Sequence, residues 1–289
     1  MPFEGWILID ATGKPWIVKG YEQPDEGYIV VNHRQRGGEP RSSSRHTAAV
    51  RAFLECVGRE VYVLPRGAIS RAIDPERAMK SVELPRRLME LLEILSPDWV
   101  GLTGSSALGL RSGLSDYDFL LYSGSPWRVY SALKDLAAEG KIKECINDVR
   151  YLKVRDSWSR EDYDLLHPLK LLDSCYEDIP FTLRILREVS EKPCCSRFEA
   201  LGWLEGPAVI HDIDESYLVP AMYDAYFDGV PGPLKLVTWR TRYQELPPGL
   251  YLVRGLVQKS LPGGELYVVP DIGGYIRPLQ VWTRQHSSS

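Results

Sequence analysis

Residues 99–123 constrain the fold of this chain more than any other stretch. They read WVGLTGSSALGLRSGLSDYDFLLYS: an apolar run, a Gly-Ser turn, small residues, two aspartates and a second apolar run. Asp116 and Asp118 are one residue apart, and strand side chains alternate, so a strand here puts both carboxylates on one face. Two ionised carboxylates side by side repel each other unless a divalent cation lies between them, and Mg²⁺ or Mn²⁺ prefers such hard oxygen ligands.

The Gly-Ser turn before the two aspartates has the features of a phosphate-binding loop. Gly104 lets the backbone approach a ligand closely, and Ser105 supplies a hydroxyl group and a backbone N–H. If a helix begins at Ser105, its free N–H groups face an anion. The turn and the acids together predict a nucleoside triphosphate that is held by the turn and polarised by a metal ion.

This arrangement resembles the signature of the DNA polymerase β-like nucleotidyltransferase superfamily, and in particular its archaeal members. The resemblance is carried by Gly104-Ser105, a ten-residue spacer, and Asp116-Tyr117-Asp118 before an apolar strand, with Arg111 also fitting the pattern. It implies transfer of a nucleotidyl group from a nucleoside triphosphate to an acceptor hydroxyl, with release of pyrophosphate. In that reaction Asp116 and Asp118 would bind Mg²⁺ or Mn²⁺, while Gly104, Ser105 and Arg111 would bind the triphosphate. The alternative is an ordinary strand–turn–strand with acids on its surface.

The superfamily pattern includes a third acid on a neighbouring strand, and this chain departs from it. The best later strand is 180–187, PFTLRILR, where alternation puts Thr182 and Arg184 on one face. Neither is an acid, which leaves three candidates for the third carboxylate: Asp148, Asp178 and Asp212. Arg184 suits triphosphate binding through its bidentate guanidinium, but it could equally pair with Asp116 or Asp118 in a metal-free, inactive protein.

Periodicity in the rest of the chain predicts the surrounding elements. The N-terminal apolar segments separated by turn formers predict a β-meander. Helical spacing predicts helices at 47–57, 81–95 and 125–140, and a helix over 160–177 that is interrupted before Pro168. Beyond residue 193 strands and turns dominate, which predicts a small antiparallel barrel or curled sheet.

We therefore expect an α+β fold: a polymerase β-like nucleotidyltransferase core, a mixed sheet with helices, between two β-rich flanks. The flanks are an N-terminal β-meander and a small antiparallel C-terminal β domain. The expected domains are 1–80 (N-terminal β-rich unit with a helix), 81–192 (nucleotidyltransferase core) and 193–289 (C-terminal barrel-like domain).

Two further stretches have a functional and a structural interpretation. Residues 35–46 are charged and rich in Gly, Ser and Arg, which suits a basic lid over phosphate or RNA, or a surface loop. In the C-terminal part, aromatic residues alternate with arginines, so that the face could stack single-stranded bases, or be half core and half solvated strand. The residues of this second stretch are Trp239, Arg240, Arg242, Tyr243, Tyr251 and Arg254.

Composition limits the partners and the compartment. The net charge of −4 argues against a polymerase that grips duplex DNA, because basic residues supply most of that affinity. No apolar run approaches the roughly 20 residues that span a bilayer, so we expect no membrane partner. The chain has five cysteines and no Cys-x-x-Cys pair, which argues against a structural zinc site and favours a reducing cytoplasm. It contains only two Asn residues but 21 Pro residues, a composition that leans toward a thermophilic source. In thermophiles, intracellular disulfides are less improbable.

The acceptor hydroxyl could belong to an RNA end, a protein or a small molecule. Because the third acid is missing, a catalytically inactive nucleotide- or RNA-binding module on the same core remains an alternative, and so does a structural or interaction protein.

Overall fold

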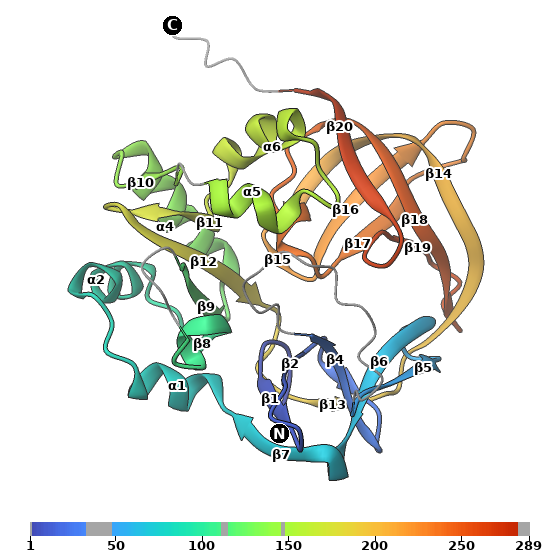
Figure 1. The fold of residues 1–289 in the computed structure, drawn as a ribbon. Coiled ribbons are helices and arrows are strands. Elements are labelled where there is room, and N and C mark those ends of the chain that lie inside the picture. Colours follow the sequence, from blue (N-terminus) through green and yellow to red (C-terminus); the bar gives the residue numbers. More distant parts are fainter. Residues whose placement is uncertain (1, 33–47, 111–114, 146–147, 283–289) are drawn as a thin grey trace, which may run out of the picture. The chain divides into compact units, whose positions relative to one another are not determined.

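A computed structural model of the chain describes residues 2–32, 48–110, 115–145 and 148–282. Backbone contacts divide the chain into two units. Unit 1 contains Met1–Lys153 and Leu171–Arg197, and unit 2 contains Val154–Lys170 and Phe198–Ser289. Figure 1 labels the elements of both units. The division into three domains stays a prediction, and the loop at 35–46 lies outside the described residues.

Unit 1 begins with a six-stranded antiparallel sheet in the order β5-β6-β4-β2-β1-β7. Its strands are β1 (Ile7–Asp10), β2 (Pro15–Val18), β4 (Gly27–Asn32), β5 (Val50–Leu54), β6 (Arg59–Pro65) and β7 (Ile69–Ile73), with the 3-10 turn η1 (Arg66–Ala68) between the last two. A separate parallel pair joins β3 (Glu22–Gln23) to β13 (Lys192–Pro193).

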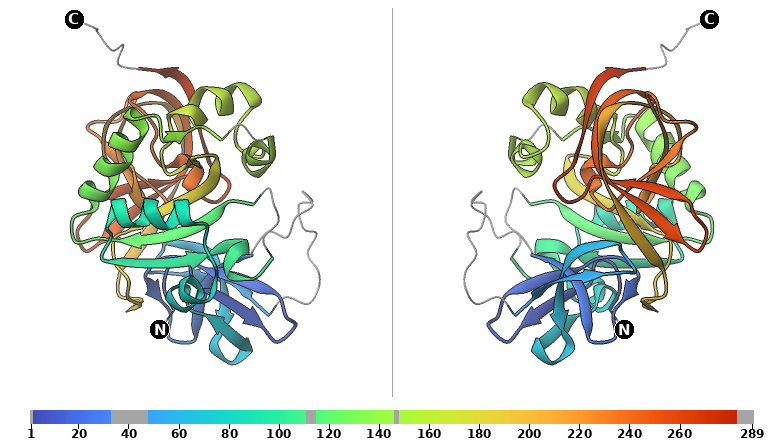
Figure 2. Two further views of the ribbon diagram at one scale, coloured as in Figure 1. Left: turned by 90° about the vertical axis from the view of Figure 1, so that its left-hand side faces the viewer. Right: turned by 90° about the vertical axis from the view of Figure 1, so that its right-hand side faces the viewer.

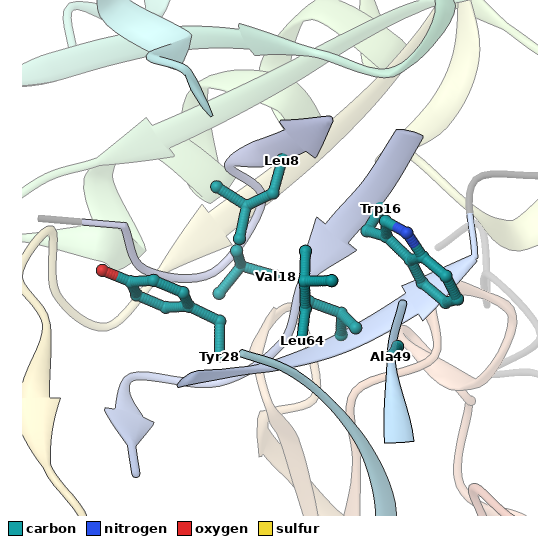
Figure 3. Packing of buried hydrophobic residues seen from close by; sticks show 7 residues of the cluster. Leu8, Trp16, Val18, Tyr28, Ala49 and Leu64 are labelled. Carbon is teal, nitrogen blue, oxygen red and sulfur yellow. The ribbon is translucent and has the colours of Figure 1, made fainter. Parts of the chain in front are cut away.

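One face of this first sheet carries a buried apolar cluster. Figure 3 shows its side chains converging from several strands: Leu8, Trp16, Val18, Tyr28, Val30, Ala49 and Leu64. The helix expected over 47–57 is wrong, because Val50–Leu54 pairs with β6 as an antiparallel strand. Its apolar residues fit a helical spacing, but the β6 partner, which supplies the backbone hydrogen bonds, decides the outcome.

The second sheet of unit 1 contains the Gly-Ser turn and the two aspartates. Its order is β10-β11-β12-β9-β8. The strands are β8 (Trp99–Thr103), β9 (Tyr117–Tyr122), β10 (Ile142–Lys143), β11 (Asp173–Tyr176) and β12 (Ile179–Leu186). β9 lies antiparallel to β8 and parallel to β12, and β11 forms an antiparallel hairpin with β12.

The helices of unit 1 are α1 (Pro75–Ser81), α2 (Arg86–Leu95), α3 (Gly104–Ala107), α4 (Pro126–Ala138) and α5 (Asp148–Val154). The predicted helices at 81–95 and 125–140 are confirmed by α2 and α4, whose inward leucines, such as Leu88 and Leu133, are fully buried. In Figure 2 the blue strands of the first sheet lie on the side of the second sheet opposite to α2. The second sheet is therefore covered on both faces, which explains why Phe119 and Leu120 are both fully buried.

Unit 2 is a barrel with a short helical segment. The ring runs β14-β16-β17-β19-β18 and closes because β14 also pairs with β18, while β20 adds to β18. Its elements are α6 (Arg160–Leu166), η2 (His167–Leu169), β14 (Arg197–Glu215), β15 (Leu218–Val219), β16 (Ala221–Phe227), β17 (Leu234–Thr238), η3 (Thr241–Tyr243), β18 (Gly249–Leu261), β19 (Leu266–Val269) and β20 (Tyr275–Val281).

The expected fold class is wrong. The chain is 45% strand and 21% helix, and its sheets include a closed five-stranded barrel, unlike a helix-plus-mixed-sheet polymerase β core with a small C-terminal domain. The barrel is also not purely antiparallel, because β17 and β19 run parallel. Two segments expected to be helical contribute to the difference: Val50–Leu54 is β5, and Asp173–Tyr176 is β11. Both segments are short. Pairing with a neighbouring strand, rather than the spacing of their own apolar residues, makes them strands.

Two of the six aromatic and arginine residues expected to form a stacking face are buried, and the other four are half-buried. Tyr243 and Tyr251 are fully buried, and the Tyr251 hydroxyl donates to the carbonyl of Pro247 over 2.6 Å. Arg242 forms an ion pair with Asp156. This stretch is therefore half core and half solvated strand, as the structural interpretation of its sequence predicted.

Two disulfides lie within unit 1. Cys56 pairs with Cys194 and Cys145 pairs with Cys175, with Cα–Cα distances of 5.5 and 5.2 Å, while Cys195 is an exposed free thiol. Disulfides are rare in the cytosol of mesophiles but common in intracellular proteins of hyperthermophiles. The cytoplasmic location and the thermophilic source both stay predictions. Among the described residues, no helix is both long enough and apolar enough to cross a membrane.

The Cys145–Cys175 bond should contribute measurably to stability. It closes a loop of 30 residues, for which the chain-entropy model gives about 3–4 kcal/mol. We expect the double variant Cys145→Ser/Cys175→Ser to lose about that much unfolding free energy in urea titrations without reductant. Cys195→Ser is the matched control and should unfold like the wild type; equal unfolding free energies for all three proteins would contradict the expectation.

Candidate functional site

The Gly-Ser turn packs directly against one of the two aspartates. β8 ends at Thr103 and α3 begins at Gly104, whose φ of +66° is a left-handed conformation that favours glycine. A Cβ atom at Gly104 would lie 2.0 Å from Oδ2 of Asp118. The turn and the Asp118 carboxylate thus touch only because residue 104 has no side chain.

The two predicted carboxylates lie on one face of the second sheet. Asp118 is on β9 and lies opposite Thr103 on β8 and Thr182 on β12. Asp116 immediately precedes β9, and its Oδ2 accepts a hydrogen bond of 2.8 Å from the Thr182 hydroxyl. Since Thr182 is the register partner of Asp118 and the hydrogen-bond partner of Asp116, both acids face the same side, as the sequence predicted. Asp116 is buried and Asp118 is half-buried.

Other predicted site residues are placed less completely. Ser105 is half-buried on α3, next to Gly104. The neighbouring Ser106, which the sequence did not single out, is buried, and its hydroxyl has no hydrogen-bond partner among the described residues. Arg111 lies outside the described residues.

A carboxylate that sequence reasoning missed lies beside this pair. Asp173 on β11 is the register partner of Thr182, and its Oδ1 lies 3.1 Å from the Thr182 hydroxyl oxygen. Asp173 also forms an ion pair with the buried Arg150 of α5. Arg150 in turn donates 3.2 Å hydrogen bonds to the carbonyls of Ser174 and Phe181. The row across the sheet is therefore Thr103, Asp118, Thr182 and Asp173.

The sequence contained one signal for Asp173. Glu177 and Asp178 both have positive φ and form the two-residue turn of the β11–β12 hairpin. Asp and Asn are among the few side chains that tolerate such turns, so an Asp between two apolar runs is a hairpin signal. That signal was overlooked because 160–177 was interpreted as one interrupted helix. In the structure α6 and η2 end at Leu169 and β11 begins at Asp173.

Of the three candidates for a third carboxylate, the structure describes the side chain of Asp178 alone. Asp178 is exposed in the hairpin turn, four residues before Thr182 along the chain. The side chains of Asp148 and Asp212 lie outside the described residues.

The predicted Arg184 is held by a carboxylate from the N-terminal segment. Its register partner on β9 is Leu120, which places it on the same face as Asp118. Arg184 Nη1 lies 3.2 Å from Oε1 of the fully buried Glu4, and Lys19 Nζ lies 2.8 Å from the same oxygen. Among the described residues, Arg184 therefore forms its ion pair with Glu4. It does not form the alternative pair, with Asp116 or Asp118, that the sequence had suggested.

Glu4 brings two basic side chains close to each other. Two cations, Lys19 and Arg184, surround one carboxylate, which also accepts a 2.7 Å hydrogen bond from the backbone N–H of Gly20. Burial, together with the nearby Glu4 charge, raises the pKa of the Tyr21 phenol well above its usual value, so Tyr21 stays neutral there. Arg184 thus places a guanidinium on the face that carries the aspartates, which suits an anion.

Three carboxylates lie close to one another on this face, and carboxylate oxygens suit a hard cation. They belong to Asp116, Asp118 and Asp173, and Asp173 pairs with Arg150. Among the described residues, the cluster of three ligand side chains within 4.8 Å of one another is Glu22, Cys56 and Cys194, whose two sulfurs form a disulfide. The three aspartates do not converge so closely. A metal ion at this face would therefore be held by Asp116 and Asp118, with Asp173 behind Thr182.

A side chain at residue 104 should disrupt this geometry. Gly104→Ala puts a Cβ on the Asp118 carboxylate and should weaken Mn²⁺ binding roughly 10- to 100-fold, the loss typical of disturbing the orientation of a metal ligand. Gly109→Ala is the matched control, because Gly109 has nearly the same φ, +68°, but nothing within 4 Å of the added atom. Isothermal titration of both variants with Mn²⁺ checks this; equal affinities would contradict the assigned contact.

Comparison with known proteins assigns no family to this geometry. No protein-family model, no curated protein and no solved structure matches the chain. The resemblance of residues 99–123 to the nucleotidyltransferase superfamily accordingly stays a prediction from their own pattern.

Proposed function

We propose that this protein is a metal-dependent nucleotidyltransferase that moves a nucleotidyl group from a nucleoside triphosphate to an acceptor hydroxyl. The observation that carries the proposal is the contact between the Gly104 turn and Asp118, with Asp116 on the same face. A phosphate-binding turn and a pair of carboxylates that share one face are the two parts that metal-assisted phosphoryl chemistry needs side by side.

The acid pair supplies the metal-binding half of the site. Asp116 and Asp118 offer hard carboxylate oxygens, which suit Mg²⁺ or Mn²⁺ rather than softer metals. When bound, the metal ion would neutralise charge on the triphosphate and on the developing transition state. Burial of Asp116 and half-burial of Asp118 strengthen the attraction for the cation, because fewer waters screen the carboxylates.

The turn and Arg184 supply the anion-binding half. Gly104 lets a phosphate approach the backbone, and Ser105 adds a hydroxyl group next to it. Arg184 is fixed by Glu4 at Nη1 and keeps a buried Nε without a hydrogen-bond partner among the described residues. A guanidinium that is anchored at one nitrogen is preorganised for a phosphate oxygen, which lowers the entropy lost on binding.

In the proposed reaction the acceptor oxygen forms a bond to the α-phosphorus, and the bond between that phosphorus and the α–β bridging oxygen breaks. The acceptor proton passes to solvent, and pyrophosphate leaves with the bonding electrons. The acceptor hydroxyl belongs to one of three classes of molecule, an RNA end, a protein or a small molecule, and we place the reaction in the cytoplasm.

A second function is favoured by one observation. Thr182 and Arg184 occupy the strand positions beside β9 where the resemblance would put an acid, and the three aspartates do not form one cluster. A chain with only two metal-binding carboxylates can bind a nucleotide or RNA without transferring a nucleotidyl group. This inactive module is the alternative to the enzyme.

Asp118→Asn separates the enzyme from its alternatives. In the wild type we expect Mg²⁺-dependent binding of a nucleoside triphosphate and release of pyrophosphate with RNA or protein acceptors. Asp118→Asn should reduce both to background, because the neutral amide loses the charge that attracts the cation. Equilibrium binding of labelled ATP, GTP, CTP and UTP and a pyrophosphate-release assay measure the two effects.

The control is Asp135→Asn, an exposed aspartate on α4 that should behave like the wild type. Triphosphate binding that depends on Asp118 but gives no pyrophosphate with any acceptor would favour the inactive module. A wild type that binds neither metal nor triphosphate would overturn both proposals.

A further inference from the structure

We infer that Thr182, Asp173 and Arg150 are positioning residues that fix the Asp116 carboxylate for metal binding. The inference rests on the proposed function, because it concerns the orientation of one of its two metal ligands. Its basis is a continuous chain of contacts from α5 through β11 and β12 to Asp116.

The Thr182 hydroxyl lies between two carboxylates but has only one proton to donate. Its oxygen is 2.8 Å from Asp116 Oδ2 and 3.1 Å from Asp173 Oδ1. A hydroxyl donates to the oxygen that carries the more negative charge. The contact with Asp116 is the shorter of the two, and Asp173 already pairs with Arg150, so we assign the proton to Asp116.

Arg150 is itself held in place from two sides. It is 4% exposed, and Nη2 donates to carbonyls at both sides of the β11–β12 hairpin, those of Ser174 and Phe181. A buried guanidinium with several partners has little freedom to swing toward another anion. Arg150 therefore keeps Asp173 paired and away from the metal site.

The Cys145–Cys175 disulfide reinforces the same contacts. Cys175 is two residues after Asp173 on β11, so both side chains point to the same face of the strand. Cys145 precedes α5, which carries Arg150. The bond thus ties the segment before α5 to the strand that Arg150 pairs with.

The expected consequence is a graded effect on metal affinity. Removing a residue that orients a metal ligand typically weakens binding by roughly 10- to 100-fold, whereas removing the ligand itself abolishes binding. Asp173 and Thr182 should fall in the first class, and Asp118 in the second.

Mn²⁺ titration of the full-length protein, followed by electron paramagnetic resonance of the free ion, tests this. We expect Thr182→Val and Asp173→Asn each to weaken Mn²⁺ binding roughly 10- to 100-fold. Thr182→Ser restores the hydroxyl and should bind like the wild type. Asp178→Asn removes the exposed acid of the same hairpin and is the matched control for Asp173→Asn.

The outcomes separate this inference from the proposed function. A wild type that binds Mn²⁺, with Thr182→Val and Asp173→Asn at wild-type affinity, overturns the inference and leaves the proposed function standing. Loss in Asp173→Asn as complete as in Asp118→Asn also overturns it, because Asp173 would then be a ligand itself. A wild type without Mn²⁺ binding overturns both. Should Thr182→Val not fold, as judged by its thermal unfolding, the isosteric Asp173→Asn decides alone.

Discussion

The geometry of the candidate site depends on the missing side chain of Gly104. Its left-handed backbone and the Asp118 carboxylate occupy neighbouring volumes, and an atom as small as a Cβ would collide with Oδ2 at 2.0 Å. The strand pairing of β8 with β9 brings Thr103 and Asp118 opposite each other, so the turn that follows Thr103 has to pass over the acid. The Gly-Ser turn and the Asp118 carboxylate are thereby fixed at the same edge of the sheet by the pairing of β8 with β9.

The N-terminal segment completes the same face, although it is far away in sequence. Glu4 is fully buried against Arg184, 180 positions later, and the Thr103 hydroxyl donates to the carbonyl of Gly5 over 2.6 Å. A Cβ at Gly5 would lie 2.5 Å from Leu120, so this glycine also permits a close approach. Burying the Glu4 charge is costly by itself, and two cations and a backbone N–H offset that cost. The first sheet therefore contributes to the site rather than only flanking it.

The parts of the site that lie close together in sequence could be predicted, and the parts formed by distant segments could not. Residues 99–123 predicted a strand, a glycine turn and two acids on one face, and α2 and α4 followed from their leucine spacing. Asp173 and Glu4 were missed because their roles depend on pairing with Thr182 and Arg184 on another strand. The fold class was wrong for the same reason, since β5 and β11 are short segments that a partner strand makes extended.

The two cysteines of the Cys145–Cys175 bond flank a segment of the chain that belongs to unit 2. Between these cysteines the chain leaves unit 1, supplies Val154–Lys170 to unit 2 and returns at Leu171. Residues 145–175 therefore form a covalent loop that the disulfide bond closes. A protease that cuts once inside it, for example near the exposed Arg155, would leave both fragments joined, and only a reductant would release them.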